Sequence, residues 1–83
     1  MTVGGRQLRV LVLPMREFGA VLRGEARIAN LPSNGEVQAV WADARGRNVG
    51  LRVFCPAYRA VPHGDPLPVF PAVVACALDL VGA

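Results

Sequence analysis

Two seven-residue segments in the middle of the chain constrain its fold more than any other feature of the sequence. Residues 36–42 and 48–54 each alternate apolar side chains with small or polar ones, and residues 43–47, which include Asp43 and Gly46, separate them. Alternation with a period of two is typical of β-strands that bury one face. The pattern therefore predicts a β-hairpin whose loop is residues 43–47.

The same alternation predicts the register of the hairpin. A five-residue loop places Ala42 opposite Asn48 and makes one face apolar throughout, with Gln38 and Arg52 together on the other face. The pairs expected on the apolar face are Trp41 with Val49, Ala39 with Leu51, and Val37 with Val53. We expect Trp41 to pack on this face under a helix, with its indole N–H bonded to one partner.

The residues before the hairpin predict one strand and one short helix. Residues 7–13 carry aliphatic side chains on both faces, which indicates an inner strand of a sheet. Residues 15–23 place apolar side chains at helical spacing before Gly24, a residue suited to end a helix. A helix of about two turns is not stable alone, so we expect it to pack a Phe18/Leu22 stripe on the sheet.

The remaining segments are less regular. Residues 26–30 predict a short strand or an extended approach to the turn at residues 31–35. Residues 56–71 contain five prolines, which favour an extended, ordered connector or an edge segment. Residues 72–80 fit either a strand or a helix, and we expect a strand because Asp79 would be the only charge on such a helix.

Together these elements predict an α+β fold. We expect a small mixed or antiparallel sheet built from the strand at residues 7–13, the central hairpin and the C-terminal strand, with one short helix packed on a face. Residues 1–83 form a single small domain in this interpretation, with residues 1–5 as a flexible N-terminus and residues 56–71 as the ordered connector.

The composition favours an oligomer. A domain of 83 residues has little interior volume, yet 53% of its residues are apolar. Part of this apolar surface must reach the outside, and a partner subunit is the usual way to cover a large exposed patch. A monomer with scattered exposed alanines and valines is the alternative, because single exposed apolar residues are common.

All nine basic residues are arginine, against six acidic residues, giving a net charge of +3. Arginine binds anionic oxygens through a planar fork of donors, so an anion or a nucleic acid is one interpretation. The same composition is typical of GC-rich bacterial or phage genomes, and +3 is low for a dedicated nucleic-acid binder. The candidate contacts for an anion or a nucleic acid are Arg45, Arg47, Arg52 and Arg59.

The sequence predicts neither a catalytic centre nor a cofactor or metal site. The side chains that could bind a transition metal are Cys55, His63, Asp65 and Cys76, and none of them has the paired spacing of a zinc site. A Cys–His nucleophile would need a third orienting group and an electropositive pocket, which the apolar surroundings of both cysteines do not suggest. We expect both cysteines to be buried free thiols.

The sequence also suggests where the protein acts. No apolar segment is long enough for a signal peptide or a membrane helix, so we expect a cytoplasmic protein or part of an intracellular phage or bacterial complex. The function expected from these observations is a non-enzymatic structural or protein-interaction module, with itself or another protein as partner. One alternative is an accessory anion- or nucleic-acid-binding protein, and another is a subunit of an enzyme or toxin-type complex.

Overall fold

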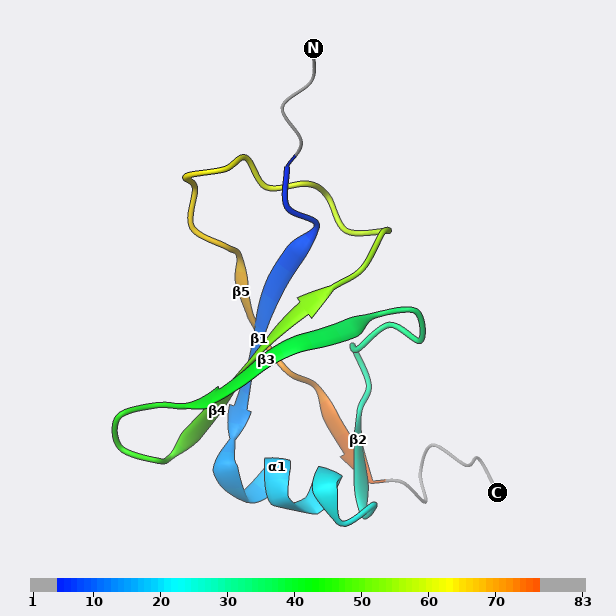
Figure 1. Ribbon diagram of the computed structural model, residues 1–83. Coiled ribbons are helices and arrows are strands. Elements are labelled where there is room, and N and C mark those ends of the chain that lie inside the picture. Colours follow the sequence, from blue (N-terminus) through cyan, green and yellow to red (C-terminus); the bar gives the residue numbers. More distant parts are fainter. Residues whose placement is uncertain (1–4, 77–83) are drawn as a thin grey trace.

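The computed structural model describes residues 5–76, which form a four-stranded sheet, a two-stranded sheet and one helix (Figure 1). The predicted α+β class is confirmed. Most of the predicted flexible start, residues 1–4, and the end of the predicted C-terminal strand, residues 77–80, lie outside the described residues. The elements are β1 (Leu8–Pro14), α1 (Met15–Leu22), β2 (Ala26–Ile28), β3 (Glu36–Ala42), β4 (Asn48–Phe54), β5 (Val69–Pro71) and β6 (Val74–Cys76).

The larger sheet has the strand order β3-β4-β1-β5. Strand β1 pairs with β4 in antiparallel and with β5 in parallel orientation, so it is the inner strand that its two apolar faces predict. The proline-rich connector supplies β5, which is only three residues long and ends at Pro71. An edge position suits this segment, because proline cannot donate a hydrogen bond to a neighbouring strand.

The prediction that the C-terminal strand joins this sheet is wrong. Strand β6 instead pairs with β2 in the two-stranded sheet. The side chain of Asn30 fixes the turn of the chain between β5 and β6, because it accepts a bond from the Val73 N–H (2.9 Å) and donates one to the Pro71 carbonyl (3.1 Å). The Ala29 N–H also donates to the Val73 carbonyl, which brings the chain after β5 alongside β2.

The hairpin has the predicted strand bounds but not the predicted register. Val37 lies opposite Val53 as expected, and a bulge at Gln38 then shifts every later pair by one residue. The shifted pairs are Ala39 with Arg52, Val40 with Leu51, Trp41 with Gly50, and Ala42 with Val49. Because a one-residue shift moves side chains to the other face, Trp41 lies on the side of the sheet away from α1, and not under it.

Hydrogen bonds in the loop explain the shift. The Asp43 N–H donates to the Asn48 carbonyl (3.0 Å), so these two residues form the last pair of the hairpin. The Asp43 carboxylate accepts bonds from the backbone N–H groups of Arg45 (3.2 Å) and Arg47 (2.9 Å) and from the Asn48 amide (3.1 Å). Gly46 takes a φ of +68°, which glycine adopts without strain. A side-chain-capped loop thus overrides the register that apolar alternation alone would choose.

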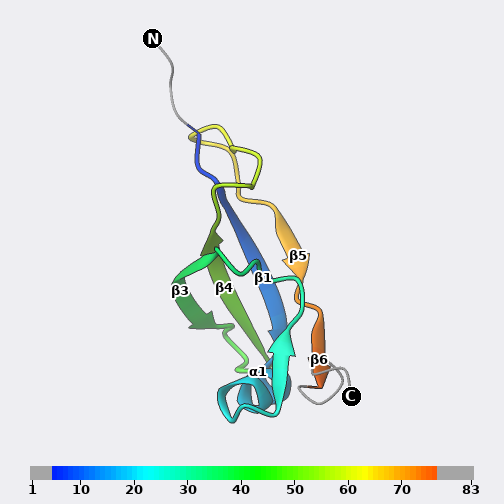
Figure 2. The same cartoon turned by 90° about the vertical axis from the view of Figure 1, so that its right-hand side faces the viewer.

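The core lies on the face of the larger sheet that α1, β2 and β6 cover (Figure 2). Phe18 and Val21 of α1 pack against it, whereas Leu22 is 71% exposed, so only the Phe18 half of the predicted stripe is correct. The helix ends as predicted, with Gly24 at a φ of +79°. The residues buried in the core are Leu11, Leu13, Val49, Leu51, Val53, Cys55 and Tyr58.

No helix among residues 5–76 is long and apolar enough to cross a membrane. α1, with eight residues, has less than half of the ~20 residues that a crossing needs.

Candidate functional site

The face of the larger sheet opposite the core is not covered by any element of residues 5–76. Figures 1 and 2 agree that α1, β2 and β6 all lie on the core side of the sheet. The alternation of the strands places mainly apolar residues on the other side. We call this surface the open face, and its apolar residues are Leu8, Val10, Val12, Ala39, Trp41, Phe54, Val69 and Pro71.

Trp41 is the largest side chain on the open face. It is 44% exposed, and its ring lies over Gly50 of the neighbouring strand. Gly50 is buried because the indole covers its backbone. A Cβ atom added to Gly50 would lie 2.5 Å from Cζ2 and 2.7 Å from Nε1 of the indole. A glycine in a strand often marks such a close approach, so Gly50 was the signal that could have predicted the position of Trp41.

The open face carries one positive and one negative charge. Arg52 is exposed in the middle of β4, between Ala39 and Val10 on the two neighbouring strands. Glu36 lies opposite Phe54 on the same face, also exposed. The single ion pair within residues 5–76 joins Arg23 to Glu25, so neither Arg52 nor Glu36 is paired within the described part of the chain.

The four predicted anion contacts do not gather at one place. Arg45 and Arg47 lie at the hairpin loop, and Arg52 lies on the open face. Arg59 follows the opposite end of β4, a strand about 20 Å long, and lines a pocket together with Arg9. Sequence reasoning missed Arg9, because its neighbour Tyr58 is distant along the chain.

The hairpin loop binds its own carboxylate. The backbone N–H of Arg47 makes the largest contribution to lowering the pKa of Asp43, and the bonds from Asn48 and Arg45 add to it. These N–H groups are therefore already occupied by an internal anion. The guanidinium groups of Arg45 and Arg47 remain exposed at the loop.

The residues that the sequence analysis considered for metal binding or nucleophilic catalysis lie on different elements. Cys55 is fully buried and its Sγ contacts Asn34 Oδ1 at 3.3 Å, while His63 is exposed in the turn before Asp65. Cys76 is an exposed free thiol at the end of β6, so the expectation that both thiols are buried holds only for Cys55. Within residues 5–76, no three His, Cys, Asp or Glu side chains gather in a group that could bind a metal ion.

No protein-family model, curated protein or solved structure matches this chain. The geometry of the open face and of the pocket beside Arg9 and Arg59 is therefore the basis for assigning a function.

Proposed function

We propose that this protein is a non-enzymatic interaction module whose open face binds the open face of a second copy. One observation carries the proposal: Trp41 is half exposed in an apolar sheet face that no described element covers. Tryptophan and arginine are, with tyrosine, enriched among the residues that dominate binding energy at protein interfaces. The open face presents both, at Trp41 and Arg52.

The charges on the open face favour a second copy as the partner. In a two-fold symmetric contact, if one residue of the first copy touches a second residue of the other copy, then that second residue of the first copy touches the first residue of the other copy. Arg52 and Glu36 lie on adjacent strands about one side-chain row, or ~7 Å, apart along the strand direction. Stacking two open faces can therefore place each Arg52 beside the Glu36 of the other copy, and satisfy both charges.

The size of the face sets the strength of this association. Four strands at ~4.8 Å spacing and seven residues at ~3.3 Å rise give a face of at most roughly 400 Å² per copy. Two such faces bury roughly 800 Å², which belongs to the weak end of specific interfaces. We therefore expect a reversible dimer that forms at micromolar concentration, with the two sheets stacked about 10 Å apart.

Adjacent residues of β3 provide a matched test. Trp41→Glu places a carboxylate on the open face, and Val40→Glu places the same carboxylate at a residue of similar exposure, 44% against 52%, that points to the opposite side. Val69→Glu is a second open-face variant, at a residue that is 63% exposed and needs no repacking of the core. All three are measured by size exclusion with light scattering at about 5 to 500 µM, with circular dichroism to verify folding.

We expect both open-face variants to stay monomeric where the unmodified protein and Val40→Glu dimerise. A monomer at every concentration for the unmodified protein, or equal dissociation by all three variants, would overturn the proposal. Recording the 260/280 nm absorbance ratio at low and high salt tests the nucleic-acid alternative in the same run. A raised ratio that falls in high salt would favour binding through the arginines instead, because phosphate contacts release counterions.

A further inference from the structure

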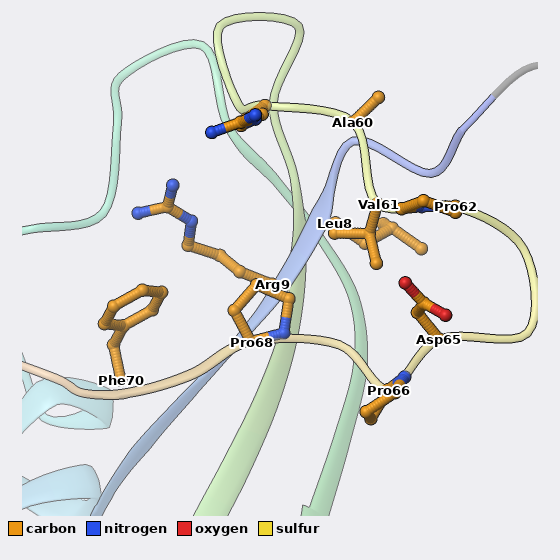
Figure 3. Close-up of a pocket in the computed structure, with 10 residues that line it drawn as sticks. Leu8, Arg9, Ala60, Val61, Pro62, Asp65, Pro66, Pro68 and Phe70 are labelled. Carbon is orange, nitrogen blue, oxygen red and sulfur yellow. The ribbon is translucent and has the colours of Figure 1, made fainter.

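A pocket of about 470 Å³ lies at the end of the larger sheet, between β1 and the segment that connects β4 to β5 (Figure 3). This volume is within the range of small-molecule sites. Its walls are mainly apolar and include Leu8, Val61, Pro66, Pro68 and Phe70. Three charged residues, Arg9, Arg59 and Asp65, also line it.

Backbone hydrogen bonds fix the shape of the pocket. Arg6 and Val61 exchange two backbone bonds of 2.8 Å, and the Val10 N–H donates to the Pro68 carbonyl at 2.9 Å. The Arg6 guanidinium also donates to the carbonyls of Pro62 and Asp65. The connecting segment is thus bonded to β1 on one side of the pocket and to Arg6, just before β1, on the other, so ligand binding would cost little conformational entropy.

Arg9 is held in place without using its hydrogen-bond donors. Its guanidinium carbon lies 3.9 Å from the ring centre of Tyr58 and 4.9 Å from that of Phe70, and both distances suit cation–π contacts. These contacts engage the face of the guanidinium and leave the N–H groups of its two terminal nitrogens available. The buried Nε has no hydrogen-bond partner, and no carboxylate of residues 5–76 forms an ion pair with Arg9.

The charges define the chemistry of a ligand. Arg59, a second guanidinium, lines the same pocket, so two sets of charged hydrogen-bond donors face a ligand there. Asp65 lies on the side of the pocket away from Arg9 and Phe70 (Figure 3) and leaves the lining with a net charge of only +1. A single negative charge fits this balance better than a phosphate ester or a polyphosphate does, and the apolar walls suit a hydrocarbon body.

We propose that this pocket binds small monocarboxylates with an apolar body, with the carboxylate at Arg9 and Arg59 and the hydrocarbon part against Val61, Pro68 and Phe70. Leu8 belongs both to the open face and to the pocket wall, but the two residues that this inference rests on, Arg9 and Phe70, lie on the core side of the sheet.

The test uses 3-phenylpropionate as the probe, with the uncharged 3-phenylpropanol and inorganic phosphate as controls. Each is titrated to about 10 mM into the ¹⁵N-labelled protein, because a fragment of this size binds in about the millimolar range. We expect saturable amide shifts near Arg9, Val61 and Phe70 with the carboxylate, and at least about fivefold weaker binding of either control. Equal affinity for the alcohol or for phosphate, or no shift at these residues, would overturn the proposal.

Charge variants give a second, directional readout. We expect Arg59→Gln to weaken binding about tenfold, the size of effect that a lost bond to a charged group has. Arg47→Gln, which removes the same charge from the exposed hairpin loop, should leave the affinity within about twofold. Asp65→Asn should strengthen binding, because it removes the negative charge from the lining. Equal effects of the two arginine variants, or weaker binding in Asp65→Asn, would refute the site.

Discussion

The ring of Trp41 lies directly on Gly50, where the absence of a side chain lets the indole lie flat against the open face of the sheet. The contact depends on the bulge at Gln38, which sets Trp41 opposite a glycine instead of opposite Val49. The tryptophan thereby shields the backbone of β4 and still presents 44% of its own surface.

Gly50→Ala should displace the indole. A methyl group at this position would overlap Cζ2 and Nε1 of Trp41, so we expect a loss of about 1–3 kcal/mol in the free energy of unfolding and a red shift of tryptophan fluorescence. The control is the same change in a Trp41→Ala background, where the overlap is gone. There Gly50→Ala should cost at least about 0.5 kcal/mol less, and full additivity of the two changes would contradict the contact.

The same leucine truncation should have very different effects in the core and on α1. Leu11 is 1% exposed and Leu22 is 71% exposed. Chemical denaturation should show that Leu11→Ala lowers the free energy of unfolding by about 2–5 kcal/mol, because it leaves a cavity. Leu22→Ala should change it by no more than about 0.5 kcal/mol. A large loss in the second variant would contradict the exposed position of Leu22.

The hairpin loop should lose stability in acid. Hydrogen bonds to its carboxylate lower the pKa of Asp43, so the folded state favours the ionised form more than the unfolded chain does. The resulting stability is present above the unfolded pKa of about 4 and is lost as the pH falls through the lower, folded pKa. NMR titration should give Asp43 a pKa below its ordinary value.

Asp43→Asn is the matched variant, since it keeps an acceptor for the Arg45 and Arg47 N–H groups but cannot titrate. Its free energy of unfolding should change less between pH 6 and pH 3 than that of the unmodified protein. A titration of Asp43 at or above the ordinary value would contradict the loop geometry.

The folded protein should lose stability at high pH because of the ionisation of Tyr58. Burial raises the pKa of Tyr58, although the nearby Arg9 charge acts in the opposite direction. Above the ordinary value of about 10, the unfolded chain releases this proton while the folded chain retains it, so stability falls as the pH rises through that window. Tyr58→Phe should remove this contribution, measured by denaturation at pH 8 and pH 10.5.

At pH 8 the same substitution should be nearly neutral. The Tyr58 hydroxyl is buried without a hydrogen-bond partner, so its removal should change the free energy of unfolding by no more than about 1 kcal/mol. A larger loss would show that the hydroxyl makes a bond, for example to a buried water molecule.

The sequence predicts this fold well where the signal is local. Strand bounds of the hairpin, the short helix and the inner strand all follow from periodicity, because alternation and helical spacing report which side of an element is buried. The predicted register was wrong from Gln38 onward, because a pattern of apolar residues does not report the Asp43 hydrogen bonds that set it. A one-residue error was enough to place Trp41 on the wrong face.

Contacts between residues that are far apart in the sequence could not be predicted either. Nothing near β1 indicates that Val69–Pro71 will pair with it, or that Arg9 will stack on Tyr58 and Phe70. The candidate site could therefore be predicted only in part. The sequence shows which residues are arginines, but only the fold places Arg52 on the open face and Arg59 in the pocket.

The place of β1 between β4 and β5 has a consequence for the order of folding. Strand β1 precedes both of its partners along the chain, and it is completed on one side by β4 of the hairpin and on the other by residues 69–71. Pairings this far apart in sequence form slowly, because a long loop must close before any contact compensates for it. Until Val69 pairs with Val10, one edge of β1 stays open to any other extended chain, so dilute conditions should favour correct refolding.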